Sequence, residues 1–137
     1  MSVPRYLLDT NVLLRFLTGE PAHQAKAARH LFGQAASGEI VLDVSPVIVA
    51  ETVYTLLSFY QVDRQTAAEH LAQLLRQPGV QLRDGDQVLA ALKRLQTSQV
   101  GFADAFLAAG AIAETLQVAS FDRDFDKLNV PRHEPKG

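Results

Sequence analysis

Four acidic residues lie where a predicted strand ends or in the first turns of a predicted helix. Asp9 directly follows an apolar run near the start of the chain, and Asp122 directly follows another near its end. Glu51 and Asp104 each interrupt a long apolar segment. Carboxylates that converge without basic partners repel one another, and a divalent cation relieves that repulsion. The pattern therefore predicts a site built from oxygen ligands.

The chemistry of such a site follows from its ligands. The chain has no Cys, and no His belongs to the acidic set, so Mg²⁺ or Mn²⁺ is favoured over Zn²⁺. Either cation can orient a water molecule, help to deprotonate it and stabilise a pentavalent phosphoryl transition state. We therefore expect hydrolysis of a phosphodiester bond, with Asp9, Glu51, Asp104 and Asp122 as the catalytic and metal-binding residues.

Each acid also has a purely structural explanation. Asp9 may be read as a helix cap, and Asp104 as an acid that a helix dipole stabilises in the first turn. Glu51 fits an exposed position between the apolar faces of a helix, and an Asp-rich turn such as the one at Asp122 is ordinary. The occurrence of all four in matching positions favours the common site.

Short apolar or β-branched runs predict the strands, and Gly, Pro and polar caps mark the ends of the helices. In the first half we expect a strand over 5–8, helices over 11–18 and 22–36, a strand over 40–44 and a helix from 46 to about 60. In the second half we expect a helix from 63 to before 78, a strand over 80–83 near an edge, a helix to about 96, a helix over 102–113, a strand over 117–121, a short helical segment over 126–128 and a last strand within 130–134.

Strands that alternate with helices predict an α/β fold with a parallel sheet. Right-handed crossovers bring the strand ends and the following helix starts to one edge of such a sheet. Asp9 and Asp122 would lie there at strand ends, Asp104 at a helix start and Glu51 in the second turn of a helix. The order of elements thus predicts that acids far apart in the sequence meet at one rim.

Composition limits the class of protein. The chain has 137 residues, 47% hydrophobic and 20% charged, which suits one domain over residues 1–137 with a sizeable core. A net charge of −2 is not that of a dedicated nucleic-acid-binding module. The absence of Cys excludes disulfides, and no signal peptide or membrane span is visible. We expect a cytoplasmic protein.

Four short motifs carry a resemblance to a known family, and each is weak when taken alone. They are Leu8-Asp9-Thr10-Asn11-Val12, Pro46-Val47-Ile48-Val49-Ala50-Glu51, Phe102-Ala103-Asp104-Ala105 and Ser120-Phe121-Asp122-Arg123-Asp124-Phe125. In this order, and over essentially the whole chain, the sequence resembles PIN-domain proteins, and closely the VapC-type toxins of bacterial toxin–antitoxin pairs. The resemblance implies a Mg²⁺- or Mn²⁺-dependent endoribonuclease. It also implies a three-layer α/β/α sandwich with a parallel sheet of about five strands in the order 3-2-1-4-5.

The resemblance assigns roles position by position. Asp9, Glu51, Asp104 and Asp122 match the family's acidic residues, while Asp124 competes with Asp122 as the fourth ligand. Thr10 or Asn11 would hold the first carboxylate by hydrogen bonds, and Ser120 stands where the family often has Thr. Candidate phosphate contacts for an RNA substrate are Arg15, Lys93, Arg94 and Arg123.

The resemblance also implies partners. A VapB-like antitoxin would inhibit the toxin through an apolar groove of the early helices, including Val12, Leu13, Phe16 and Leu17. A homodimer through the helices rich in small residues is expected, and a membrane is not.

Other classes of protein share parts of this pattern. A haloacid-dehalogenase-type hydrolase wants a second acid where Asn11 stands, and a receiver domain wants an acidic pair after its first strand and a Lys after its last. Neither pattern is found. A non-catalytic PIN scaffold, or a PIN nuclease of RNA processing without a toxin role, remains the alternative.

Overall fold

The computed structural model describes residues 2–137, which form short strands and helices in alternation. The elements of the first half are β1 (Arg5–Leu7), α1 (Thr10–Thr18), α2 (Ala22–Ala36), β2 (Val41–Val44), α3 (Pro46–Ser58) and α4 (Arg64–Leu75). Those of the second half are β3 (Val80–Leu82), α5 (Gly85–Thr97), α6 (Phe102–Glu114), β4 (Val118–Ala119), α7 (Asp124–Lys127) and β5 (Arg132–His133). None of the helices in residues 2–137 is long and apolar enough to cross a membrane.

Local chemistry sets several helix ends where the sequence predicts them. Gly19 ends α1 in the left-handed conformation with φ at 75°, which costs Gly little because it has no Cβ. Asp63 caps α4, and its Oδ2 accepts a hydrogen bond of 3.1 Å from the backbone N–H of Thr66. Pro46 occupies the first position of α3, where a backbone N–H has no partner in the helix.

The strands form two parallel sheets. In the first, β2 lies between β1 and β3, so that Tyr6 is opposite Leu42 and Leu42 is opposite Val80. β3 is an edge strand, as its sequence predicts. In the second, β4 pairs with β5 alone. The α/β class and the parallel pairing are confirmed, and the strand neighbours 3-2-1 and 4-5 agree with the expected order.

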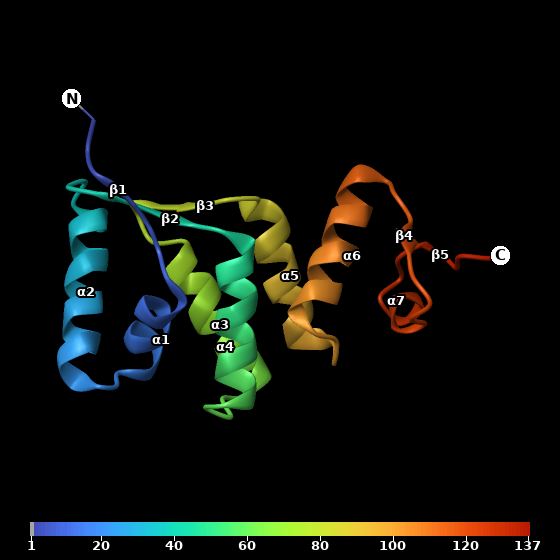
Figure 1. Cartoon of the computed structure of the whole chain (residues 1–137), viewed down its shortest axis with the longest axis horizontal. Coiled ribbons are helices and arrows are strands. Elements are labelled where there is room, and N and C mark those ends of the chain that lie inside the picture. Colours follow the sequence, from blue (N-terminus) through green and yellow to red (C-terminus); the bar gives the residue numbers. More distant parts are fainter. Residues whose placement is uncertain (1) are drawn as a thin grey trace.

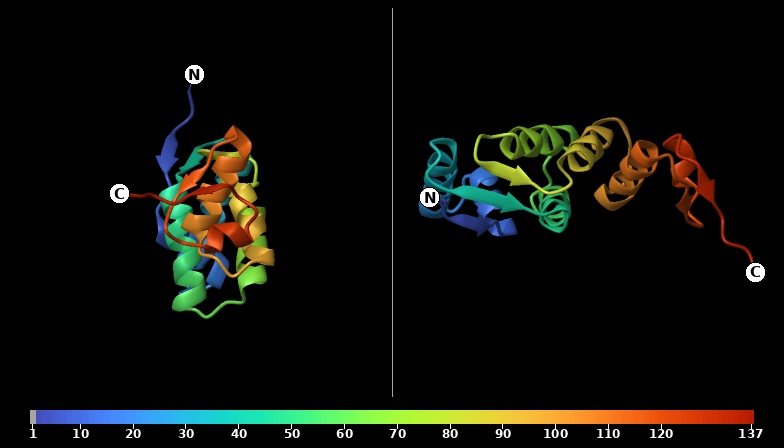
Figure 2. Two further views of the ribbon diagram at one scale, coloured as in Figure 1. Left: turned by 90° about the vertical axis from the view of Figure 1, so that its right-hand side faces the viewer. Right: turned by 90° about the horizontal axis from the view of Figure 1, so that it is seen from above.

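The expected single sheet would also pair β1 with β4, and among residues 2–137 that pairing is not formed. The reason is the course of α6, which packs along α5 instead of crossing back over the sheet. β4 therefore begins beyond α6, on the far side of the helices from β1 (Figures 1 and 2). The molecule is elongated in consequence, and the second sheet lies at the end opposite α2 (Figure 1).

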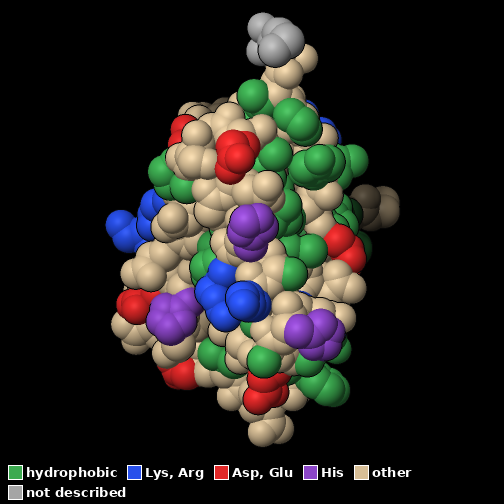
Figure 3. Space-filling model, turned by 90° about the vertical axis from the view of Figure 1, so that its left-hand side faces the viewer, with side chains coloured by type: hydrophobic (Ala, Val, Ile, Leu, Met, Phe, Trp, Pro, Cys, Tyr) green, Lys and Arg blue, Asp and Glu red, His purple; other side chains and the backbone are tan. Residues whose placement is uncertain are grey.

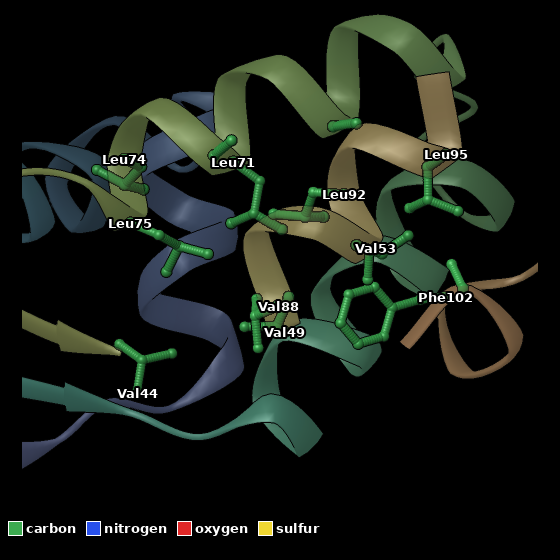
Figure 4. Packing of buried hydrophobic residues seen from close by; sticks show 14 of the residues in the cluster. Val44, Val49, Val53, Leu71, Leu74, Leu75, Val88, Leu92, Leu95 and Phe102 are labelled. Atoms are coloured by element: carbon green, nitrogen blue, oxygen red, sulfur yellow. The ribbon is translucent and has the colours of Figure 1, made fainter. Parts of the chain in front are cut away.

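The core lies between the first sheet and the helices α1 to α5, which occupy one side of that sheet (Figure 1). Leu42 and Val44 of β2 are fully buried against these helices. In Figure 4, Leu71 of α4 and Leu92 of α5 lie side by side, and Phe102 at the start of α6 lies beside Val53 of α3. Burial of this many aliphatic side chains is the main source of stability.

The opposite face of the first sheet carries a charged cluster. Asp43 of β2 is buried, with its side chain only 6% exposed, and it accepts hydrogen bonds of 3.0 Å from Arg5 and 2.9 Å from Arg83. Arg5 also donates to Gln81 of β3. The cluster links all three strands from the side that the helices do not cover.

The segment from Phe102 to the C-terminus, which we call the C-terminal unit, comprises α6, β4, α7 and β5. Besides apolar packing, two side-chain hydrogen bonds within residues 2–137 join it to α5 of its own chain. The Gln87 side-chain amide donates a hydrogen bond of 2.9 Å to the carbonyl oxygen of Phe106, and Arg94 donates a longer one of 3.4 Å to that of Leu128. Ala105 and Ala108 are fully buried within the chain. These two small residues of α6 therefore pack inside the chain itself.

Candidate functional site

Asp9 lies at the junction of β1 and α1, as expected for an acid at a strand end. It occupies the N-cap position with an extended backbone, and its exposed side chain makes no capping hydrogen bond. A capping role therefore does not account for it. The neighbouring Thr10 is buried, and its hydroxyl oxygen has no hydrogen-bond partner in residues 2–137. A buried polar atom without a partner costs stability. The hydroxyl of Thr10 is thus an unused hydrogen-bond donor and acceptor beside Asp9.

Glu51 projects from the second turn of α3 into solvent. The residues about one turn before and after it are apolar, yet Val47 and Tyr54 are each 72% exposed. They share a helix face with Glu51 through their i−4 and i+3 spacing. The acid thus lies on an uncovered apolar stripe of α3.

Asp104 lies in the first turn of α6 and is half-buried. Burial raises the pKa of its carboxyl, and the negative charges of Asp122 and Asp124 raise it further. The N-cap of this helix is Gly101, which has no side chain to offer. Asp104 is therefore held near two other acids without a basic group that lowers its pKa.

Asp122 and Asp124 form one tight turn after β4. The carboxylate of Asp122 accepts a hydrogen bond of 2.9 Å from the backbone N–H of Asp124, and the N–H of Asp122 donates to the hydroxyl of Ser120 at 3.0 Å. Asp124 makes an exposed ion pair of 3.5 Å with Lys127. Ser120 thus shapes the turn, and of the two acids only Asp122 lacks a basic partner in residues 2–137.

The acids fall into two sets. Asp104, Asp122 and Asp124 are close enough to interact electrostatically and all belong to the C-terminal unit. Asp9 and Glu51 belong to the helices that follow β1 and β2. Within residues 2–137, no group of three or more His, Asp or Glu side chains is close enough to hold a metal ion. The donor chemistry suits a hard divalent cation, but this arrangement of one chain does not place the donors around one.

The candidate phosphate contacts are spread over the surface. Arg15 donates a hydrogen bond of 2.7 Å to Gln24 across α1 and α2, whereas Lys93 lines a different groove between α4 and α5. Arg94 contacts the C-terminal unit, and Arg123 precedes α7. In this conformation they do not make one basic path.

The early helices enclose an apolar groove of about 370 Å³, lined by Val12, Ala28 and Leu31 with Asn11 and Arg15 at its polar side. Of the other residues expected there, Leu13 is fully buried in the core, while Phe16 and Leu17 line a separate hollow beside α4. Figure 3 shows the end of the molecule formed by α2, where His, Lys and Arg side chains lie among apolar ones.

Two residues important to the structure were not singled out from the sequence. The sequence does hold a signal for Asp43, since an acid inside a β-branched strand needs a partner when it is buried, and Arg5 and Arg83 belong to the predicted strands over 5–8 and 80–83. The sequence holds no such signal for Gln87, because its hydrogen bond to Phe106 depends on how α5 and α6 pack together.

Comparison with protein-family models confirms the resemblance to the PIN-domain family. The PIN domain family model matches residues 6–131, and the chain belongs to the PIN domain family. None of the curated proteins matches the sequence significantly. Among solved structures, the chain is similar to the crystal structure of VapBC2 from Rickettsia felis bound to a DNA fragment from their promoter. Identity is 15% and the TM-score is 0.39, over 94% of this chain and 97% of that one.

Proposed function

We propose that this PIN-domain chain is a divalent-metal-dependent endoribonuclease that acts in the cytoplasm as the toxin of a VapBC-type pair. The observation that carries the proposal is the set of acids in the C-terminal unit. Asp104 has its pKa raised by burial and by Asp122 and Asp124, so the unit concentrates negative charge that no basic group offsets at Asp104. With Asp9 and Glu51, these acids are the oxygen ligands that Mg²⁺ or Mn²⁺ takes.

Structural roles do not account for the acids of the first set. Asp9 makes no capping hydrogen bond, and Glu51 is solvent-exposed on an apolar stripe. A residue retained for stability would gain a partner, as Asp63 and Asp43 do. Asp9 and Glu51 therefore supply free carboxylates near the edge of the sheet where ligands of parallel α/β proteins bind.

The nuclease is tested with purified protein and structured or single-stranded RNA. We expect cleavage with Mg²⁺ or Mn²⁺, none after chelation with EDTA, and at least a hundredfold loss on Asp9→Asn. The matched control is Asp86→Asn, because Asp86 is an exposed acid in the first turn of α5 and lies outside the site. Cleavage that survives both EDTA and Asp9→Asn would show a contaminating enzyme and would leave the scaffold alternative.

The toxin role is tested in cells. Expression of the chain alone should arrest growth, and expression with the neighbouring open reading frame should restore it. The apolar groove between α1 and α2 offers such an antitoxin a docking site, where Arg15 could meet an acidic group of the partner. Harmless expression of a folded, RNA-cleaving protein would place the chain among PIN nucleases without a toxin role.

A further inference from the structure

The apolar side chains that the chain leaves exposed are not scattered over its surface. Within residues 2–137, ten large hydrophobic side chains are exposed: three in or just before β1, three on α3 or at its end, and four in the C-terminal unit. Neither α2, α4 nor α5 exposes one. An apolar surface confined to a few elements marks an interface.

β1 is one half of that interface. A parallel strand is normally covered on both faces, but Leu7 of β1 is 74% exposed, and within residues 2–137 β1 is an edge strand that pairs only with β2. An unpaired edge offers a row of backbone donors and acceptors to another strand. Asp9 lies two residues beyond the end of this edge.

β4 is the complementary half. It pairs only with β5, and a sheet of two short strands is marginal when isolated. Phe121, two residues after the end of β4, is 72% exposed. Because the strand pairs within residues 2–137 are all parallel, addition of β4 to β1 in the same sense would continue one sheet. It would also place Asp122, which follows β4, at the same edge as Asp9.

The chain's own β4 lies at the wrong end of the molecule for this pairing. Figures 1 and 2 place β1 and β4 on opposite sides of the helices. α6 is held on α5 by the bond from Gln87 to Phe106 and by the burial of Phe102 in the core. A second copy, in contrast, can present its β4 to β1 without breaking either contact.

We propose that two copies of this chain exchange their C-terminal units, so that β4 of each pairs with β1 of the other. Each site would then combine Asp9 and Glu51 of one copy with Asp104 and Asp122 of its partner. The exchange is reciprocal, which closes the dimer with twofold symmetry and leaves no free edge at β1. As an account of catalysis the inference rests on the proposed function, while the exchange itself does not.

Cross-linking tests the exchange without any activity. The chain has no Cys, so one is introduced at Leu7 and a second at Ala119, and a short bismaleimide joins thiols that lie close together. In the double variant we expect a covalent dimer. A Leu7→Cys chain refolded with an Ala119→Cys chain should also give a covalent heterodimer. Tyr6→Cys replaces Leu7→Cys if the latter does not fold, and Arg29→Cys on α2 paired with Ala119→Cys is the control that should not cross-link.

Two results would overturn the exchange: cross-linked product that keeps the monomer mass, because β1 and β4 then meet within one chain, or no cross-link in folded protein. Complementation tests the shared site. Asp9→Asn and Asp104→Asn chains, each inactive, are unfolded together and refolded. Half of the resulting dimers should contain one chain of each kind, and each mixed dimer holds one intact site of two. About a quarter of wild-type activity should therefore return. No recovery despite a cross-linked dimer and active wild type would refute the shared site. A cross-linked dimer with inactive wild type would refute the nuclease alone.

Discussion

The side-chain amide of Gln87 on α5 donates a hydrogen bond to the carbonyl oxygen of Phe106 on α6, and Gly110 leaves room for it one turn later. A Cβ at Gly110 would lie 2.5 Å from the Gln87 amide nitrogen, closer than real Cβ atoms come. The two residues together fix the spacing of the helices and thereby the position of the C-terminal unit.

This relationship predicts non-additive substitutions. Gln87→Ala should cost about 1 kcal/mol of unfolding free energy for the lost hydrogen bond, and Gly110→Ala should cost a similar amount because it displaces the amide. In the double variant the alanine at 110 has free space, so the combined loss should be smaller than the sum. Urea unfolding of the four proteins measures this; Gln77→Ala, which removes an exposed bond of 3.4 Å, is the control. Strict additivity would mean that the two residues do not share this contact.

Gly79 should not tolerate a side chain. Its φ is +84°, and a Cβ there would overlap the backbone carbonyl of Ala35 at the end of α2. Strain and overlap act together, so Gly79→Ala should destabilise the protein by about 2 kcal/mol or more. Gly38→Ala is the matched control, because Gly38 also has positive φ at +85° but has no atom within 4 Å of its Cβ position. Equal losses in thermal melts would attribute the whole effect to backbone strain.

Asp43 should make stability depend on acid pH. Hydrogen bonds from Arg83, and more weakly from Arg5, hold its pKa below the usual 3.8 despite the opposing effect of burial. Because the pKa of Asp43 is lower in the folded state, its ionised carboxylate stabilises the fold at any pH above the unfolded-state pKa. This stabilisation is lost as the pH falls from about 4 through the folded-state pKa. Asp43→Asn should lose roughly 1–2 kcal/mol at pH 7, because both arginines are half exposed. The difference from wild type should shrink below pH 4; a constant difference would rule out the ion pairs as its cause.

Asp104 should behave in the opposite sense. Burial and the charges of Asp122 and Asp124 raise its folded-state pKa above 3.8. The ionised carboxylate therefore destabilises the fold at pH values above the folded-state pKa. That destabilisation is relieved as the pH falls through the folded-state pKa. In EDTA at low ionic strength, Asp104→Asn should gain on the order of 1 kcal/mol at pH 7. Asp86→Asn is again the control, since Asp86 occupies the first turn of α5 and should lose a few tenths of a kcal/mol with its favourable dipole interaction. A destabilised Asp104→Asn protein would assign Asp104 a structural role.

Added metal should make wild type more stable than Asp104→Asn, the reverse of the order expected in EDTA. If the acids hold Mg²⁺ or Mn²⁺, wild type should gain about 2.7 kcal/mol at a hundredfold excess over the dissociation constant. Asp104→Asn should gain much less, because it lacks one of the charges. Calorimetric melts with each cation measure both proteins, with Na⁺ at equal ionic strength as the control. Equal gains in the two proteins would remove Asp104 from the ligand set.

Local signals in the sequence were sufficient for most elements. Gly19 ends a helix and Asp63 begins one as expected, because their backbone and side-chain preferences act within a single turn. The strands proved shorter than predicted: β4 covers only Val118–Ala119, and Ser120 and Phe121 lie outside it. Apolar runs mark buried segments, but they do not mark where pairing with a neighbour stops.

In the candidate site, too, the sequence predicts local positions but not which segments meet. The sequence places Asp9 after a strand and Asp104 in a first helical turn, since both positions depend on neighbours in the chain. It does not determine that Asp104 lies near Asp122 while Asp9 does not join them, because this depends on the path of α6. Asp43 was overlooked for a similar reason, as its partners Arg5 and Arg83 are 38 and 40 residues away.

The division of the acids also has a consequence for synthesis. The ribosome makes β1 to α5 before the C-terminal unit, and the buried contacts among these first elements do not wait for the rest of the chain. A nascent chain therefore carries Asp9 and Glu51 but neither Asp104 nor Asp122. The proposed site is therefore completed only after the C-terminal unit has been made and, under the proposed exchange, only when two finished chains meet.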